Sequence, residues 1–462
     1  MSQPAGAPLA TVVVVNYNGA HLLPPCLEGL RRQDLPVGTF ETVVVDNASR
    51  DGSLELLSRD FPEVRVIASP VNTGFAGGNN LALRTVSTPY VVLLNNDAVP
   101  EPDWLRNLLA PFQAAGAERL GVVTGKVVFA PRFLPLRLRT EGFDPGPHDP
   151  RELGVRLVAV EVDGRDVTEK VLWEKLAYGP EGTGAGRFRW TRPEGGFLVP
   201  VQDGPGSPAN TVSGSMKVTF RWIAERDKPV TITGDGVSLT ATATEAGSEA
   251  VLTVPEGTPL VDVVNNAGGI VLVNGYGADR GFQEPDTGQY DRPAEVFNAC
   301  GNGMAMRTAA GRSVGWFDDD FFLYYEDTDL SWRLRADGWS IRYQPTAVLP
   351  HLHSASSTEW SPLWVFHVDR NRLLMLTKDA SAPLALREVL HYPLTSASML
   401  VRAGREALRS RSRPALRPHL LRARVLASYV RLLPTMVRRR RQFGRRAVRS
   451  RRDLERWLVR ER

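Results

Sequence analysis

The chain of 462 residues is poor in cysteine and has no long apolar run. Its two cysteines, Cys26 and Cys300, lie far apart in the sequence, which argues against a disulfide framework. No segment approaches the ~20 consecutive apolar residues that a bilayer crossing requires. The N-terminus also lacks the charged start and hydrophobic segment of a secretion signal. These absences predict a cytoplasmic protein without transmembrane helices.

The chain also lacks the common nucleotide-binding signatures. Its Gly-rich segment 72–80 (NTGFAGGNN) fits neither the GxGxxG dinucleotide pattern nor the Walker A loop with its lysine. Small residues would nevertheless let the backbone approach a phosphate, and the following residues 81–86 (LALRTV) predict a helix start whose free N–H groups favour an anion.

Three apolar runs each end in a polar turn: residues 11–19 (TVVVVNYNG), 42–53 (TVVVDNASRDGS) and 90–97 (YVVLLNND). Continuous valine runs are typical of parallel strands covered on both faces, and ligands bind outside the carboxyl ends of such strands. Asn16, Asp46 and Asp97 should therefore point toward one crevice. Asp97 suits a hard metal ion, although a plain β-turn is the alternative, since Asn, Asp and Pro all favour turns.

A second acidic cluster mixes carboxylates with aromatic residues, in residues 317–335 (FDDDFFLYYEDTDLSWRLR). Solvated acidic surfaces rarely carry so many large aromatic side chains. Asp327 precedes Leu330 and Leu334 at helical spacing, so it could cap a helix, act as a catalytic base, or do both. Farther along, His351 and His353 fall on one face of an expected strand, a spacing compatible with a metal site.

The chain resembles the inverting family 2 glycosyltransferases, in particular their bacterial rhamnosyltransferase-like branch. The resemblance rests on an ordered series of segments: VVVVNYNG, VVVDNASRDGS, NTGFAGGNN, YVVLLNNDAVP, CGNGMAMR, FFLYYEDTDLSWR and QPTAVLPHLHSAS. It covers roughly residues 9–130 and 275–380. It implies an α/β GT-A fold, a nucleotide-diphospho-sugar donor, and a divalent metal, either Mg²⁺ or Mn²⁺.

The resemblance also implies roles for individual residues. Asp327 would be the general base, with Glu326 beside it in the family's Glu-Asp pair. Asp97 would be the metal ligand, in a DxD-type motif whose first carboxylate is here the amide of Asn95, and His351 would add a metal or diphosphate contact. The implied donor side comprises Asn16, Asp46, Asn72, Gly74, Gly77, Asn79 and Asn95, and the implied acceptor side comprises Asp319, Gly303, Trp332 and Arg333. A core tryptophan and a surface arginine are the alternatives for the last two.

The chemistry requires few protein groups. One carboxylate that takes the proton of an acceptor hydroxyl is enough for a single displacement, which inverts the anomeric carbon, whereas a retaining route needs a carboxylate nucleophile. The acceptor expected from the resemblance is a lipid-linked glycan or a polysaccharide. The competing hypothesis is a non-catalytic glycan-binding protein, and the loss of the first carboxylate in the metal motif favours it.

The length and the changes of pattern predict four regions. Residues 1–140 and 275–385 would form the nucleotide-sugar-binding and the acceptor halves of the GT-A core. Residues 144–264 consist of short alternating runs divided by Gly, Pro and Asp, a pattern typical of an inserted β-sandwich. Residues 386–462 would form a helical tail rich in arginine.

Residues 401–462 contain 21 arginines, no lysine and four acidic residues, a net charge of +17. The whole chain carries +5, so the remainder carries −12. Arginines mixed with Leu and Val predict amphipathic helices lying on an anionic membrane, and we expect peripheral attachment at the inner face of the plasma membrane. Nucleic acid is the rival partner for an arginine cluster. No nucleic-acid motif accompanies this cluster, so we do not expect the protein to bind nucleic acid. Removal of residues 401–462 is expected to spare activity.

Overall fold

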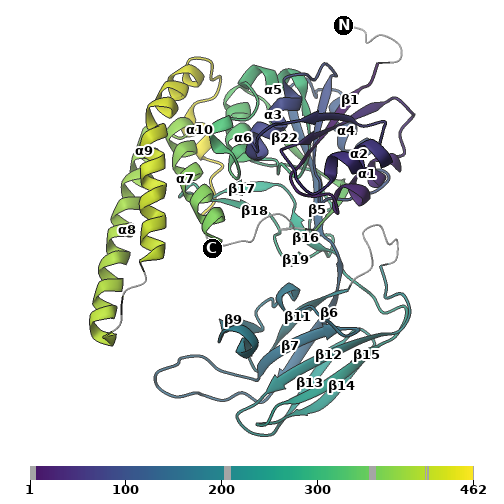
Figure 1. Ribbon diagram of the computed structural model, residues 1–462, viewed down its shortest axis with the longest axis vertical. Coiled ribbons are helices and arrows are strands. Elements are labelled where there is room, and N and C mark those ends of the chain that lie inside the picture. The colour runs from purple at the N-terminus through teal and green to yellow at the C-terminus, as the bar shows by residue number, and fades with distance from the viewer. Residues whose placement is uncertain (1–6, 202–209, 353–360, 412, 414–415, 461–462) are drawn as a thin grey trace. The chain divides into compact units, whose positions relative to one another are not determined.

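The computed structural model describes residues 7–201, 210–352, 361–411, 413 and 416–460 (Figure 1). The chain forms two compact units. The first comprises Met1–Val127, Asn265–Phe282 and Gly288–Arg462, and the second comprises Val128–Val264 and Gln283–Thr287. The second unit is thus an insertion into the first.

The first unit is built on a mixed sheet with the strand order β5-β21-β4-β1-β2-β3, in which β22 pairs with β5 and with the short β20. Strands β1 to β4 pair in parallel, whereas β21 runs antiparallel to both β4 and β5. The strands are β1 Ala10–Asn16, β2 Phe40–Asp46, β3 Arg65–Ala68, β4 Tyr90–Asn95, β5 Leu120–Phe129, β20 Ala294–Glu295, β21 Gly303–Arg307 and β22 Ser340–His351.

Helices cover this sheet because the valine-rich strands are apolar on both faces. Val12, Val44 and Val92 are fully buried in one cluster, together with Leu23 and Trp104 of the covering helices. The helices are α1 Leu23–Arg31, α2 Ser53–Asp60, α3 Gly74–Leu83, α4 Trp104–Leu109, α5 Thr308–Val314 and α6 Glu326–Ala336.

The strand register brings the polar ends of the parallel strands to one edge of the sheet. Asn16 at the end of β1 is level with Asp46 at the end of β2, and Val15 is level with Asn95 at the end of β4. The prediction that these strand ends share an edge is confirmed, because the three valine runs form adjacent parallel strands.

The second unit consists of two antiparallel sheets that share one hydrophobic core, as in a β-sandwich. Phe197, Phe220 and Trp222 are among its buried side chains. The unit begins near Val128 rather than at residue 144, because β6 pairs with β11 and β13. The strands are β6 Arg132–Thr140, β7 Arg156–Val162, β8 Arg165–Asp166, β9 Ala177–Glu181, β10 Phe188–Thr191, β11 Glu194–Val201, β12 Met216–Ile223, β13 Lys228–Gly234, β14 Val237–Ala243 and β15 Ser248–Val254.

The C-terminal part of the first unit is helical, with α7 Pro362–Asp379, α8 Ala382–Ser410, α9 Arg417–Gly444 and α10 Arg451–Glu455. Helix α9 lies beside α7 (Figure 1). Val425, Tyr429 and Met436 of α9 and Leu454 of α10 are buried in the same cluster as Leu373 of α7. The expectation that removal of residues 401–462 spares activity therefore needs correction, because their removal would expose this core.

None of the helices that the structure describes is both long enough and apolar enough to cross a membrane.

Candidate functional site

The edge of the sheet after β1 and β2 is organised by two asparagines. Asn16 is fully buried, and its amide nitrogen donates to the hydroxyl of Ser53 at 2.9 Å and to the carboxylate of Asp46 at 3.4 Å. Its amide oxygen accepts from the side chain of Asn96 at 2.8 Å, which joins the end of β1 to the turn after β4. Asn16 thus fixes the positions of neighbouring site residues.

Asn47, directly after Asp46, was not singled out from the sequence. Its amide nitrogen donates to the Asn72 side chain at 3.1 Å and to the Gly74 carbonyl at 3.0 Å, and its amide oxygen accepts from the Thr73 N–H at 2.9 Å. Asn47 therefore ties the Gly-rich loop to the end of β2. The available signal was its place beside Asp46 in the polar turn.

The glycines of this loop meet protein atoms at close range. Gly74 has a φ of +71°, and a Cβ there would lie 2.3 Å from the Phe322 carbonyl oxygen. A Cβ on Gly77 would lie 2.7 Å from the Cβ of Thr73. Helix α3 already begins at Gly74, which corrects the expected helix start after residue 80. Asn79 is buried within this helix, and its side chain donates to the Phe75 carbonyl.

Asp97 and His351 form the most compact pair of potential metal ligands at this edge. The Nε2 atom of His351 lies 3.0 Å from Oδ1 of Asp97, and both side chains are about nine-tenths buried. The backbone holds the pair, because His351 ends β22 and is bridged to Ala98, and the Leu352 N–H donates to the Asp97 carbonyl at 2.9 Å. His353 lies outside the described residues.

Asp327 stands near the start of α6. The N–H of Gly301 donates to its Oδ2 at 3.1 Å, and the N–H of Thr328 donates to its Oδ1 at 2.6 Å. Burial raises the pKa of Asp327, and these hydrogen bonds to the ionised form oppose the increase. The backbone carbonyl of Asn302, the residue after Gly301, accepts from the Asn95 N–H at 3.0 Å. The loop of Gly301 and Asn302 therefore links the end of β4 to Asp327.

Glu326 is buried next to Asp327, and within the part of the chain that the structure describes its Oε2 has no hydrogen-bond partner. Burial, and then the negative charge of Asp327, raise the pKa of Glu326 well above its usual value. Of the two neighbouring carboxyl groups, Asp327 therefore has the better-stabilised anion.

The loop before α6 has a backbone that helix α7 holds in place. Phe322, Tyr324 and Tyr325 have φ values of +63°, +67° and +69°, a region that bulky residues rarely occupy. The buried amide of Asn371 donates to the carbonyls of Phe321, Leu323 and Tyr324 at 2.7–2.9 Å. These bonds fix the direction in which the chain enters α6, and therefore the position of Asp327.

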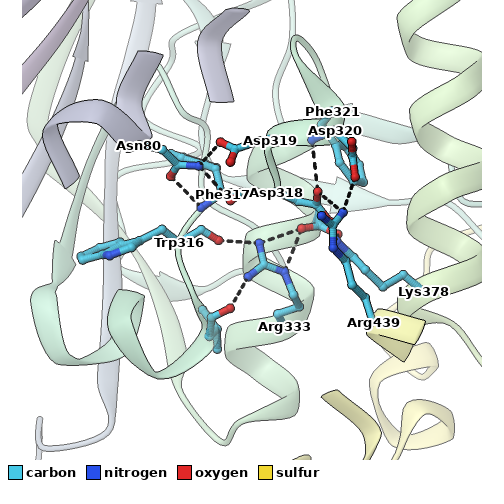
Figure 2. A network of polar contacts seen from close by, with 12 residues as sticks. Asn80, Trp316, Phe317, Asp318, Asp319, Asp320, Phe321, Arg333, Lys378 and Arg439 are labelled. Carbon is cyan, nitrogen blue, oxygen red and sulfur yellow. Dashed lines mark hydrogen bonds and ion pairs between the residues drawn. The ribbon is translucent and has the colours of Figure 1, made fainter. Parts of the chain in front are cut away.

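A network of buried and partly buried charges includes carboxylates of the same loop (Figure 2). Lys378 is fully buried, 2.6 Å from Asp318 and in contact with Asp329. Arg333 pairs with Asp329 at 2.7 Å, and Arg439 of α9 pairs with Asp318 and, at 2.6 Å, with Asp320. Two of these three cations come from α7 and α9, and the buried Asp379 lies beside Asp329 as a further carboxyl group of the network.

Three residues expected on the acceptor side have structural contacts instead. Trp332 and Arg333 are only 1% and 3% exposed, and Arg333 donates to the carbonyls of Val314 and Trp316. Gly303 lies within β21, where a Cβ would be 2.3 Å from a methyl carbon of Leu349. Because all three residues are buried, the prediction that they lie on the acceptor side needs correction, and their contacts indicate packing roles.

Asp319 remains half-exposed. Its carboxylate accepts from the side chain of Asn80 at 2.6 Å and pairs with Arg84 at 2.8 Å, so one residue of α3 and the residue that follows α3 hold it in place. Asn80 also bonds the backbone of Phe317 at both its carbonyl and its N–H. Helix α3 therefore connects the Gly-rich loop to the acidic loop.

Residues 11–152 match the glycosyl transferase family 2 model. Among curated proteins, the chain is 25% identical over 117 residues to glycosyltransferase AglE of Haloferax volcanii, covering 25% of this chain and 38% of AglE. It is 33% identical over 112 residues to the succinoglycan biosynthesis protein ExoO of Rhizobium meliloti, covering 24% of this chain and 32% of ExoO. The match thus spans well under half the length of these relatives.

Among solved structures, GalNAc-T7 with UDP, GalNAc and Mn²⁺ aligns with a TM-score of 0.44 and 10% identity, over 81% of this chain and 48% of that one. The family match and the mixed sheet with its helices confirm the predicted α/β class of GT-A type. They also agree with the expected β-rich insertion and C-terminal helices.

Proposed function

We propose that this protein is an inverting, metal-dependent glycosyltransferase. It would move a sugar from a nucleotide-diphospho-sugar to a lipid-linked glycan or a polysaccharide. One observation carries the proposal: the Asp97–His351 pair and the hydrogen-bonded Asp327 are joined through the Asn95–Asn302 contact at one edge of the sheet. A protein that only binds glycans needs neither a base nor a metal ligand there.

The residues present fit a divalent cation. A carboxylate oxygen and an imidazole nitrogen 3.0 Å apart can both bind one ion. Within the described part of the chain, no group of three or more His, Cys, Asp and Glu side chains could hold a metal. Asp97 and His351 would thus leave coordination positions for diphosphate oxygens and water, as is usual for Mg²⁺. The bound ion would neutralise the charge that develops on the departing diphosphate.

Asp327 would accept the proton of the acceptor hydroxyl as that oxygen attacks the anomeric carbon. Its pKa, raised by burial, brings the carboxylate closer in basicity to the working pH, which favours proton transfer. The N–H groups of Gly301 and Thr328 orient the carboxylate. Burial and the charge of Asp327 raise the pKa of Glu326, which disfavours a second negative charge beside Asp327.

The donor would lie along the ends of β1, β2 and α3. Asp46 and the loop of Asn72 and Gly74, held by Asn47, are the proposed contacts of the base and the ribose. The branch resembled makes dTDP-rhamnose the first donor to test, followed by UDP-galactofuranose. The relatives named for succinoglycan biosynthesis and glycosyl transfer support an acceptor in surface-glycan synthesis.

We further propose that the protein works in the cytoplasm, attached peripherally to the inner face of the plasma membrane. The support is the charge of its last 62 residues, which contain 21 arginines. Anionic lipids attract such segments by about 1 kcal/mol for each basic residue near the surface.

A thermal-shift screen of nucleotide-sugars tests the assignment. A donor that binds only the folded state raises the unfolding temperature, because stability increases by RT ln(1 + [L]/Kd). We expect a shift that needs Mn²⁺ or Mg²⁺ and is lost in Asp97→Ala. A screen in which no nucleotide-sugar shifts the unmodified protein would contradict the proposal.

A further inference from the structure

Helix α8 exposes a line of large apolar side chains. Leu386, Leu390, Leu394, Val401 and Leu408 are 60%, 53%, 68%, 53% and 82% exposed. Their spacing of four and seven residues returns to the same face of a helix. The opposite face of α8 is the one that packs on the core, where Leu384, Glu388 and Tyr392 are buried.

The line is continuous and free of charge. From Leu386 to Leu408 it runs roughly 33 Å at 1.5 Å per residue. The positions between these residues on the same face are Pro393, Ala397, Leu400 and Gly404. Single exposed leucines need no explanation, but a contiguous apolar surface on a helix indicates an interaction site.

Arginines border this apolar line on one side. Arg387, Arg402, Arg405 and Arg409 fall next to it at helical spacing, and all four are exposed. Of the two acidic residues of α8, Glu388 pairs with Arg387 at 2.8 Å and with Arg372 at 3.1 Å. The remaining border arginines, Arg402, Arg405 and Arg409, outnumber the exposed Glu406 and keep the border positive. Apolar side chains beside cationic ones are the pattern of helices that lie in a membrane interface.

We infer that the solvent-facing side of α8 is the membrane-contact surface of this protein, and that it binds an anionic bilayer with its axis parallel to the surface. This inference rests on the membrane attachment proposed above and assigns it to one helix face. The leucines would enter the headgroup and acyl boundary, while the arginines would meet lipid phosphates.

A second copy of the chain is a less suitable occupant. An antiparallel pair of α8 helices about a two-fold axis would place the arginine borders of both copies side by side. The like charges of two adjacent arginine borders repel each other, whereas the lipid phosphates of an anionic bilayer neutralise them. Helix α9 is less available to a membrane, because two arginines near its C-terminal end contact protein: Arg439 pairs with Asp318 and Asp320, and Arg440 donates to the carbonyls of Thr377 and Ala380.

Co-sedimentation of the full-length protein with vesicles tests the inference, using phosphatidylglycerol–phosphatidylcholine mixtures and phosphatidylcholine alone. The double variant Leu390→Gln/Leu394→Gln keeps good helix formers on α8. It should lose roughly tenfold to a hundredfold of its partitioning onto anionic vesicles, since two apolar contacts are removed. The control Val37→Gln/Val251→Gln changes two exposed valines elsewhere, 106% and 44% exposed, and should bind like the unmodified protein.

Two results would overturn the inference. One is equal binding of the α8 variant and the control to anionic vesicles. The other is a protein that dimerises without lipid and becomes monomeric on Leu390→Gln/Leu394→Gln with unchanged vesicle binding, as expected if α8 contacts a second copy. Thermal shifts with a donor nucleotide-sugar should be equal in all variants. If the unmodified protein shows no thermal shift with any donor, that result counts against the proposed enzyme activity. The vesicle experiment still tests the membrane-contact surface independently.

Discussion

Arg439 of α9 donates to the carboxylate of Asp320 at 2.6 Å, across a sequence separation of 119 residues. The same guanidinium contacts the nearly buried carboxylate of Asp318. Asp318 and Asp320 belong to the loop that leads into α6 and Asp327 (Figure 2). The arginine-rich tail therefore contributes a charge to the core of the proposed catalytic unit.

We expect Arg439→Gln to lower the free energy of unfolding by about 1–3 kcal/mol, because it removes the cation that contacts both Asp318 and Asp320. Activity should decrease with stability, since this loop sets the position of Asp327. The matched control is Arg438→Gln, which changes the adjacent, exposed arginine and should stay within about 0.5 kcal/mol of the unmodified protein. Equal stabilities of the two variants in urea denaturation would contradict the role of Arg439.

The sequence could not predict this contact. The strand ends at Asn16, Asp46 and Asn95 were readable, because each valine run stops at a polar turn and parallel strands align their carboxyl ends. The partner of Arg439 was not readable, since it depends on the packing of α9 on α7 and nothing local marks one arginine among 21. Charge composition predicted amphipathic helices on an anionic membrane, whereas the buried Tyr429 and Met436 show that one side of α9 packs on protein.

Asp97→Ala should abolish the metal dependence of nucleoside diphosphate binding while the protein remains folded. The reason is that a single carboxylate and His351 are the proposed protein ligands. Isothermal titration with UDP and dTDP, with Mn²⁺ and with chelator, measures the effect. His351→Ala should weaken the metal-dependent binding without changing the chelated baseline. Equal affinity of the unmodified protein with Mn²⁺ and with chelator would rule out the metal site.

Glu326→Gln should change the pH dependence of stability. Burial, and then the charge of Asp327, raise the pKa of Glu326 well above its usual value, so the folded protein keeps this proton where the unfolded chain has released it. Its contribution to stability is present below about pH 4.5 and is lost as the pH rises through the folded pKa. Glutamine does not titrate, so the variant should gain stability relative to the unmodified protein as the pH rises. Unfolding temperatures from pH 4 to 9 test this, and a constant difference would show that Glu326 has an ordinary pKa.

The roles of the polar residues were predictable only where the sequence placed them beside a strand end. Asp97 and His351 meet because β22 returns to the end of β4. The sequence indicated a strand before His351 but not where that strand lies. Trp332 and Arg333 were misassigned because helical position alone does not reveal which face is buried. Asn371 was missed, since a polar residue between two arginines of a mixed helix gives no sign of the three carbonyls that it binds.

The central claim is that Asp327 is the base of a glycosyl transfer, and turnover of Asp327→Asn tests it most directly. With a donor identified by thermal shift and a soluble acceptor, we expect turnover to decrease by roughly 10²–10⁴ while the donor dissociation constant stays unchanged. Glu326→Gln, which keeps the neighbouring group neutral, should retain most of the turnover and is the matched control. Full turnover in Asp327→Asn, or a loss of donor affinity equal to the loss of rate, would contradict the account.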